Sequence, residues 1–406
     1  MNRRTLRAGV ASGRVIAPPS KSDLHRLLVA AALCGSAARV DCGTDALSED
    51  IAATQDCLRS LLDAQSPSPA LDCRESGSTL RFLLPLAAAL GKTAHFTGTG
   101  RLPERPLEPL LTLLRTHGVQ VEGDRLPLRI SGQLQVGKYA LPGNISSQYL
   151  TGLLFALPLL EGDSVIQLTS PLESAGYVTM TMRTLRRFGV RYILDTPESC
   201  VLPGGQRYHS AETRLTPEGD WSNAAFWLAA GALTGEITLA GLSADSAQPD
   251  AAILPLLRRM GAIVEANPAG EIRVCKSSLR GAELDASECP DLVPTAAVLM
   301  ALAQGESRIH HAARLRLKES DRLAAMAQNL HALGAQVEEL PDGLLFHGVP
   351  QLRGGAVQSF ADHRIAMAMA VAALRAQGET TLGGAESVRK SYPAFWEIYD
   401  RLLAAQ

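Results

Sequence analysis

The chain has 406 residues, and its 39 Lys and Arg are balanced by 41 Asp and Glu, which gives a formal net charge of -2. This balance leaves no basic excess for binding a nucleic-acid backbone. With 46% hydrophobic and 20% charged residues, the composition also excludes bulk disorder, and the length predicts two or three domains. Only 4% of the residues are aromatic, which favours helices packed against sheets in an α/β or α+β fold.

The first residues are polar, and no segment holds eighteen uninterrupted apolar residues, so we expect a protein that is neither secreted nor membrane-spanning. The seven cysteines are scattered and form no Cys-x-x-Cys pair, which predicts reduced, buried thiols and a cytoplasmic location. The nine histidines show no metal-ligand spacing. We expect His310 and His311 to point to opposite faces of a strand, and we expect no metal.

An apolar segment closed by a glycine recurs six times along the chain, and the glycines lie 56, 71, 73, 70 and 73 residues apart. Because these segments are apolar all round, they predict buried helices. The segments are residues 24–35, 79–91, 149–162, 224–235, 292–305 and 365–378.

A second, amphipathic segment follows the same period and ends at Gly118, Gly189, Gly261 and Gly334. Leucines at i, i+3 and i+4 predict a helix, and the glycine predicts its C-terminal cap. The Gly-x-x-Val pattern that follows indicates a strand. Residues 49–63 and 394–405 supply the first and last copies, so each repeat holds two helices and several strands.

Each repeat is expected to hold one fully buried helix and one helix that faces solvent on one side. This arrangement predicts that the helices lie inside each lobe and the sheets lie on its outside. Three repeats would form each of two similar lobes, and residues 203–220 are the most loop-like connection between the third and fourth repeats. The alternative is a set of ordinary βα units in a barrel or a doubly wound sheet. A barrel repeats at roughly 30 residues, which is far shorter than the period here.

Polar residues stand where each buried helix should begin. Ser222 and Asp362 are explained by helix capping alone. Parallel packing of the helices would nevertheless bring their positive ends to one face, where an anion is favoured. The residues at these starts are Lys21, Ser22, Gly77, Ser78, Ser146, Ser147, Gln148, Ser222, Asn223, Pro290, Asp291, Asp362, His363 and Arg364.

Basic residues gather near the same positions, and Arg26 and Arg364 lie within apolar helices, where a guanidinium needs a carboxylate or a phosphate. Ion pairs with nearby acids are the alternative for any one of them, but together the cations outnumber those acids. We therefore expect a site for small, multiply charged anions. The cations are Lys21, Arg26, Arg81, Arg105, Arg322, Arg364, Arg389 and Lys390.

Asp291 and Glu319 stand out as acids in this basic setting. A carboxylate among anion-binding cations weakens the binding of an anion, so its presence calls for another role. Proton transfer is such a role, and we expect general acid or base catalysis from both residues. Simple ion pairing is the alternative.

Eight motifs in this order resemble the enolpyruvyl transferase family over nearly the whole chain, and within it the members that act on shikimate 3-phosphate. The motifs are PPSKSxxxR at 18–26, ESGSTLR at 75–81, ERP at 104–106, SSQYL at 146–150, PD at 290–291, KESDR at 318–322, DHR at 362–364, and Lys390 before Tyr392 and Pro393. The resemblance implies a two-lobed inside-out α/β barrel of six βαβαββ repeats with buried parallel helices. Residues 21–217 would form the N-terminal lobe, and residues 1–20 with 218–406 the C-terminal lobe.

The reaction implied by the resemblance transfers the enolpyruvyl group of phosphoenolpyruvate to the 5-hydroxyl of shikimate 3-phosphate and releases phosphate, on the route to chorismate. It implies no cofactor and no metal, and we expect a monomer. Shikimate 3-phosphate would be held by Lys21, Ser22, Arg26, Ser146, Ser147, Gln148, Ser174, Tyr177, Asp291 and Lys318. Phosphoenolpyruvate would be held by Lys21, Gly77, Arg105, Gln148, Arg322, Arg364 and Lys390.

Addition across the enol double bond adds a proton to the methylene carbon and removes one from the attacking hydroxyl. By the resemblance, Glu319 serves the methylene carbon, Asp291 serves the hydroxyl, and Lys21 shares the proton transfer. Glu75 and Arg314 stand where many or some family members have Asn, so neither is given a binding role.

Two other functions stay open at this point. Enolpyruvyl transfer to UDP-N-acetylglucosamine is the nearest, but its enzymes usually carry a cysteine in the loop that here spans residues 97–106 and has none. A non-catalytic anion-binding protein would explain the cations but not Asp291 and Glu319.

Overall fold

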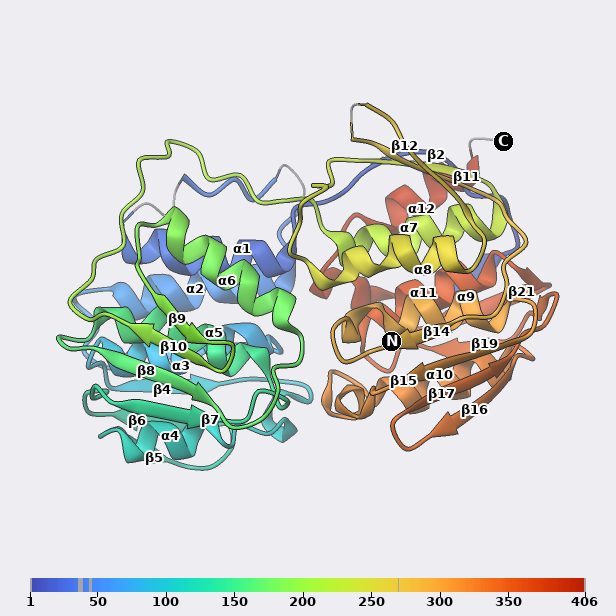
Figure 1. The fold of residues 1–406 in the computed structure, drawn as a ribbon. Helices are drawn as coiled ribbons and strands as arrows, with labels where there is room; N and C mark the ends of the chain where they lie inside the picture. Colours follow the sequence, from blue (N-terminus) through green and yellow to red (C-terminus); the bar gives the residue numbers. More distant parts are fainter. Residues whose placement is uncertain (1, 36–38, 44–45, 269, 405–406) are drawn as a thin grey trace. The chain divides into compact units, whose positions relative to one another are not determined.

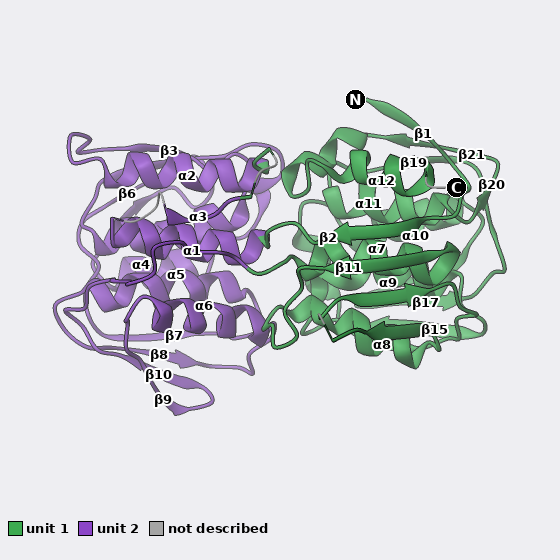
Figure 2. Ribbon diagram, turned by 90° about the horizontal axis from the view of Figure 1, so that it is seen from above, with its two compact units in different colours: residues 1–20, 43–48, 218–406 green, residues 21–42, 49–217 purple. Residues whose placement is uncertain are grey.

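The computed structural model describes residues 2–35, 39–43, 46–268 and 270–404. Contacts divide the chain into two compact units (Figure 1) (Figure 2). Unit 1 holds residues 1–20, 43–48 and 218–406, and unit 2 holds residues 21–42 and 49–217. The connection at residues 203–220 contains neither a helix nor a strand.

One helix of each repeat is buried, as the all-round apolar segments predict. Every residue of α9 and α11 is buried, and in α3 every residue except Ser78. These helices are α1 (Lys21–Leu33), α3 (Gly77–Ala89), α5 (Ser147–Ala156), α7 (Trp221–Thr234), α9 (Val293–Ala301) and α11 (His363–Ala373).

The second helix of each repeat buries only part of its surface. In four of them the glycine after the helix has a φ between 69° and 89°. A strand begins two residues after Gly118, Gly261 and Gly334, as the Gly-x-x-Val pattern predicts, and four residues after Gly189. These helices are α2 (Glu49–Leu62), α4 (Leu110–Thr116), α6 (Ala175–Arg187), α8 (Ile253–Arg259), α10 (Arg322–Ala332) and α12 (Phe395–Ala404).

Four sheets share one topology. In each, the first strand pairs in parallel with the second, the second pairs antiparallel with the fourth, and the fourth pairs antiparallel with the third. In three of these sheets a buried helix joins the first two strands, whereas in the sheet of β2 and β11 the chain passes through unit 2 before α7 leads into β11. In all four an amphipathic helix joins the second and third strands, so these repeats read βαβαββ.

In unit 2 these sheets are β3 (Ala70–Asp72), β4 (Ala94–Thr97), β5 (Gln120–Glu122) and β6 (Leu128–Ser131), and β7 (Lys138–Leu141), β8 (Ser164–Leu168), β9 (Ile193–Thr196) and β10 (Ser199–Leu202). In unit 1 they are β2 (Ser12–Ile16), β11 (Glu236–Ala240), β12 (Ile263–Ala266) and β13 (Ile272–Cys275), and β14 (Glu283–Asp285), β15 (Glu306–His310), β16 (Gln336–Leu340) and β17 (Gly343–His347).

The first and last repeats depart from this pattern. In the last repeat β19 (Ala356–Gln358) pairs in parallel with β21 (Glu379–Gly383), and β1 (Arg3–Arg7) from the chain's beginning supplies the antiparallel neighbour. The short strands β18 (Leu352–Arg353) and β20 (Ala376–Gln377) pair beside it. Within its described residues, the first repeat shows a single bridge from Val40 to Leu215 instead of a sheet.

Each unit buries its own hydrophobic core. Trp227 stacks on Phe395 at 4.8 Å between ring centres in unit 1, and Phe82 contacts Phe155 at 6.1 Å in unit 2. The buried helices fill the middle of each unit and the sheets lie outside them (Figure 1). Among the described residues, no helix is long and apolar enough to cross a membrane.

Candidate active site

The starts of several helices meet on one side of unit 2. Lys21 Nζ at the start of α1 donates to Asp50 Oδ2 at the start of α2 at 2.7 Å. Gln148 Nε2 at the start of α5 donates to Ser78 Oγ at the start of α3 at 2.9 Å. Each bond joins the first turns of two helices, so the positive ends of α1 and α2 are close together, as are those of α5 and α3.

Arg26 is buried one turn into α1 and is held by neutral oxygen atoms. Its guanidinium donates to Ser22 O at 2.6 Å, to Tyr177 O at 2.9 Å and to Thr181 Oγ1 at 2.9 Å. Burial lowers the pKa of Arg26 to about 10, although Asp23 and Tyr177 act in the opposite direction. A buried cation with neutral acceptors is a favourable place for an anion.

Gly77 begins α3 directly beside two guanidinium groups. A Cβ atom at this position would lie 2.5 Å from Arg81 Nη1 and 2.7 Å from Arg105 Nη1, so only glycine leaves both groups in place. Arg81 Nη1 also donates to Gln148 Oε1 at 3.1 Å. Two cations therefore stand at a helix N-terminus, which together favour a bound anion.

Three of the four predicted serines of unit 2 lie at the starts of α5 and α6, and the fourth, Ser22, is in the first turn of α1. Ser146 caps α5 by accepting from Gln148 N at 3.3 Å, and Ser147 is the buried first residue of that helix. Ser174 precedes α6 with a φ of 57°, and Tyr177 N donates to Ser174 O at 3.1 Å.

Unit 1 has its own cluster at helix starts, centred on Asp291 in η5 (Pro290–Leu292). Arg322 Nη1 donates to Asp291 Oδ1 at 2.8 Å, and Arg364 Nη2 donates to Asp291 Oδ2 at 3.0 Å. Lys318 Nζ, after η6 (Ala313–Leu317), lies 4.0 Å from Asp291 Oδ1. Burial raises the pKa of Asp291, but Arg364, Lys318 and Arg322 outweigh it and hold the pKa well below its usual range.

Arg322 connects the two predicted acids. Its Nη2 donates to Glu319 Oε2 at 2.8 Å, and its Nε donates to Asp362 Oδ2 at 2.8 Å. Burial of this guanidinium lowers its pKa, yet Asp362, Glu319 and Asp291 together raise the pKa well above its usual range. One buried cation thus fixes the carboxylates of Asp291 and Glu319 on the same side of unit 1.

Lys390 ends η7 (Ala385–Lys390), and its Nζ donates to Ala361 O at 2.5 Å. Ala361 directly precedes Asp362, which caps α11 by accepting from Arg364 N at 2.9 Å. Lys390 therefore lies at the start of the helix that carries Arg364.

A sequence profile of the EPSP synthase (3-phosphoshikimate 1-carboxyvinyltransferase) family matches residues 8–399. The chain belongs to the EPSP synthase family. A relative from Clostridium acetobutylicum named 3-phosphoshikimate 1-carboxyvinyltransferase is 43% identical and aligns over 96% of this chain and 95% of its own. A relative of the same name from Clostridium kluyveri is also 43% identical, over the same shares of the two chains.

Solved structures agree on the fold. An EPSP synthase from Acinetobacter baumannii matches with a TM-score of 0.78 at 27% identity, over 98% of each chain. The enolpyruvyl transferase NikO from Streptomyces tendae matches with a TM-score of 0.77 at 22% identity, over 98% of this chain and 96% of its own, and shows the fold alone. The predicted α/β fold of two lobes is confirmed. The alternative of ordinary βα units in a single barrel or a doubly wound sheet is excluded.

Asp250 in η4 (Pro249–Ala252) is a buried acid of this cluster that the sequence analysis missed. Ser222 Oγ donates to Asp250 Oδ2, and Arg364 Nη1 lies 3.9 Å from the same oxygen. Burial raises the pKa of Asp250 to about 7, because Arg364 and Ser222 offset only part of the desolvation. In the sequence, the one feature that could have drawn attention to Asp250 is that it follows Pro249 directly before the amphipathic segment ending at Gly261.

Capping by Ser222, one of the two capping explanations, is wrong. Asp220 Oδ1 accepts from Asn223 N at 2.7 Å, so the cap lies two residues earlier, α7 begins at Trp221, and the Ser222 hydroxyl contacts Asp250 instead. Capping by Asp362 is confirmed, but this carboxylate also binds Arg322.

In unit 1, ion pairing with acids, which was the alternative for any one predicted cation, applies to Arg322 and Arg364. There Arg322 and Arg364 lie among four acids. Sequence distance hides these partners, since Asp250 and Asp362 come from other repeats. The acids are Asp250, Asp291, Glu319 and Asp362.

The prediction that His310 and His311 point to opposite faces of a strand is also wrong. β15 ends at His310, and His311 has a φ of 54°, which turns its side chain back. The two rings contact each other with their centres 4.6 Å apart.

A cavity of about 700 Å³ in unit 1 lies away from these helix starts. Its lining includes Leu233 near the end of α7, Leu302 after α9 and Arg375 after α11. The residues that line it include none of the predicted site residues.

Proposed function

We propose that this chain transfers the enolpyruvyl group of phosphoenolpyruvate to the 5-hydroxyl of shikimate 3-phosphate and releases phosphate. The observation that carries the proposal is the cluster in unit 1, where Arg322 holds both Asp291 and Glu319 at helix starts. The family match and the names of the relatives support shikimate 3-phosphate over UDP-N-acetylglucosamine as the acceptor.

The residues proposed for shikimate 3-phosphate surround the starts of α1, α5 and α6 in unit 2. Arg26 is the strongest candidate for its phosphate, because a phosphate oxygen would replace neutral acceptors with a charged one. The further candidates are Lys21, Ser22, Ser146, Ser147, Gln148, Ser174 and Tyr177 in unit 2, and Asp291 and Lys318 in unit 1.

Phosphoenolpyruvate carries a phosphate and a carboxylate, and both suit guanidinium groups. In unit 2 the candidates gather where Gly77 allows Arg105 to approach the start of α3. The further candidates are Lys21 and Gln148 in unit 2, and Arg322, Arg364 and Lys390 in unit 1.

The reaction needs two proton transfers in its first step. The methylene carbon gains a proton while the substrate hydroxyl attacks the neighbouring carbon and loses its own proton. Phosphate then leaves as the methyl group loses a proton and the double bond forms again. Asp291 is proposed to accept the hydroxyl proton, because Arg364, Lys318 and Arg322 keep its carboxylate ionised and therefore able to take up a proton. Glu319 is proposed to exchange the methylene proton, and Lys21 to share in these transfers.

The deciding experiment measures phosphate release from phosphoenolpyruvate with no acceptor, with shikimate 3-phosphate and with UDP-N-acetylglucosamine. We expect release only with shikimate 3-phosphate. Release only with the nucleotide sugar would assign the chain to the other acceptor. Binding of both anions with no release in any mixture would instead support an anion-binding protein.

Three further properties stay predictions. Activity after extensive dialysis tests whether the reaction needs a dissociable cofactor, and activity in the presence of a metal chelator tests whether it needs a metal. Light scattering coupled to size-exclusion chromatography tests the expected monomer, and cell fractionation tests the cytoplasmic location.

A further inference from the structure

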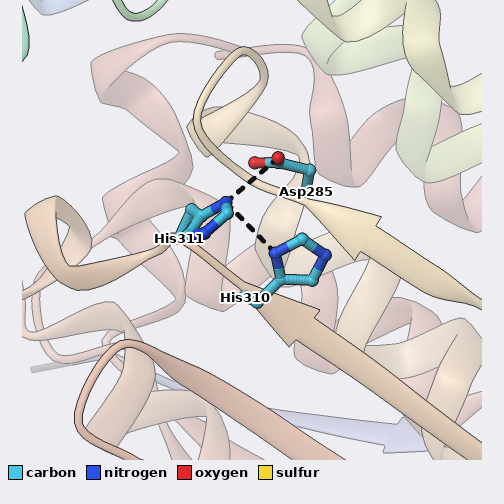
Figure 3. A group of neighbouring side chains, drawn as sticks. All are labelled: Asp285, His310 and His311. Carbon is cyan, nitrogen blue, oxygen red and sulfur yellow. Dashed lines mark hydrogen bonds and ion pairs between the residues drawn. The ribbon is translucent and has the colours of Figure 1, made fainter.

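Two neighbouring strands of unit 1 end with potential metal ligands. Asp285 is the last residue of β14 and His310 the last of β15, and the two are direct partners in the parallel pairing. His311 follows, and its left-handed backbone turns its ring toward the other two side chains (Figure 3).

The ligand atoms of the three side chains converge. His311 Nδ1 lies 3.0 Å from Asp285 Oδ2 and 3.2 Å from His310 Nδ1, and the ligand atoms of all three residues lie within 4.8 Å of one another. Two ligands at ~2.0–2.1 Å from a tetrahedral zinc ion lie ~3.3 Å apart. The two distances from His311 Nδ1 are close to this value, and the ligand atoms of Asp285 and His310 lie no more than 4.8 Å apart.

Hydrogen bonds alone cannot satisfy the polar atoms of these three side chains in this arrangement. His311 Nδ1 carries either one hydrogen or one lone pair, but it faces both a carboxylate oxygen and another ring nitrogen. A hydrogen there can point at only one of them, and a lone pair there would face the carboxylate. A cation at the point of convergence would satisfy all three groups together.

We propose that Asp285, His310 and His311 bind a Zn²⁺ ion, with water completing the coordination. Two imidazoles and one carboxylate are ligands that this ion accepts. The side chains of His311 and Asp285 are 61% and 50% exposed, so an ion reaches them from solvent. Ser287 N donates to Asp285 Oδ1 at 2.9 Å, which orients Oδ2 toward the histidines.

The ion would join the ends of β14 and β15. The chain continues from these ends into η5, which holds Asp291, and into η6, which precedes Lys318 and Glu319. Arg314 Nη2 donates to Ser287 O at 2.7 Å, so a positive charge lies close to the loop that follows Asp285. Binding of the metal ion therefore depends on the three ligands and not on an excess of negative charge. The site would stabilise the folded unit, since a ligand that binds only the folded state raises its stability.

Cobalt titration of the full chain, first treated with a chelator, tests the proposal. We expect Co²⁺ alone to give visible absorption bands for one ion per chain, without the thiolate charge-transfer band that cysteine ligands would add. Zn²⁺ should displace the cobalt and raise the melting temperature. In Asp285→Asn and His311→Gln, cobalt affinity should fall by more than about tenfold.

His347→Gln is the matched control, because His347 is an exposed histidine of the same sheet whose Nδ1 lies 3.9 Å from Glu306 Oε2. It should bind cobalt as the parent does. Melting in chelator should be the same for all variants, which shows that they fold. The proposal is overturned if the parent binds no cobalt at micromolar concentrations, or if Asp285→Asn and His311→Gln bind it as tightly as the parent.

Discussion

Arg26 in unit 2 and Arg322 in unit 1 are both buried arginines near helix starts, but their partners differ. Arg26 donates to a hydroxyl and to backbone carbonyls, and its pKa is lowered by burial. Arg322 donates to three carboxylates, and they raise its pKa despite burial. A buried arginine thus keeps neutral partners in unit 2, where we propose that it binds an anion, and holds carboxylates in place in unit 1.

This difference has an energetic consequence. An anion that reaches Arg26 replaces neutral acceptors and gains a charge-assisted bond. An anion that reaches Arg322 must compete with carboxylates already in place. Arg322 is therefore expected to contribute less to phosphoenolpyruvate binding than to fixing Asp291 and Glu319 for proton transfer.

Glu319→Gln should have the largest effect on activity. The amide keeps the shape and still accepts from Arg322, but it cannot exchange a proton. Turnover at saturation should fall by about 10² to 10⁴, as for loss of a general acid, while calorimetry should show shikimate 3-phosphate binding nearly unchanged.

Glu339→Gln is the control, because Glu339 accepts from Arg316 at 2.6 Å as an ion-pair partner elsewhere in unit 1. It should leave turnover near that of the parent. A Glu319→Gln variant with more than about half of the parent turnover would remove Glu319 from the mechanism.

Arg322→Met and Arg26→Met compare the two arginines directly. Removal of Arg322 leaves three carboxylates without their common cation, so the free energy of unfolding should fall by about 3–5 kcal/mol. Removal of Arg26 should lower it by at most about 1 kcal/mol, because Thr181 also donates to Tyr177 O at 3.0 Å and contacts Thr151 Oγ1 at 2.9 Å. Denaturant unfolding of both variants measures these free energies. Equal losses of unfolding free energy would contradict the proposed difference between the two arginines.

Arg105→Ala and Lys390→Ala should weaken phosphoenolpyruvate binding by about 10- to 100-fold, the value of a charge-assisted hydrogen bond. Shikimate 3-phosphate binding should change far less, since each residue is proposed to contact only one ligand. Arg101→Ala is the control from the same loop, where Arg101 pairs with Glu104 at 3.4 Å. Calorimetry with each ligand decides, and equal losses for both ligands would mean that the assignment is wrong.

Asp250→Asn should change the pH dependence of stability. The folded pKa of about 7 lies above the ordinary value of ~3.9 for an unfolded aspartate. The folded state therefore holds an extra proton between these values, and the free energy of unfolding falls as pH rises through that window.

The Asn variant should lack this slope in unfolding measurements between pH 5 and pH 8. Asp291 acts in the opposite sense, since its low pKa gives stability that is lost only as the pH falls below about 4. Identical slopes in parent and variant would contradict the protonated state of Asp250.

Much of the fold could be predicted because its signals are local. A segment that is apolar all round specifies a buried helix wherever its repeat is placed, and Gly118 or Gly334 ends a helix through its own backbone conformation. The pairing of β1 with β21 could not be predicted, because residues 3–7 meet residues 379–383 and no short pattern records that partner.

The candidate site shows the same division. Asp291, Glu319 and Arg322 stand in recognisable motifs, and the structure brings them together. Asp50 and Asp250 carry no motif, and only packing of helices distant in sequence shows that they contact Lys21 and Ser222. The left-handed turn at His311 likewise depends on its position after the end of β15.

The deuterium content of product formed in D₂O tests most directly whether Glu319 of unit 1 transfers the proton while Arg105 of unit 2 only binds substrate. The methylene carbon gains a solvent-derived proton during addition, so the enolpyruvyl group of the product should carry deuterium. We expect Glu319→Gln to slow deuterium incorporation by the same factor as turnover. Arg105→Ala at saturating phosphoenolpyruvate should keep the parent's incorporation per turnover. Incorporation by Glu319→Gln at the parent's rate would contradict the account.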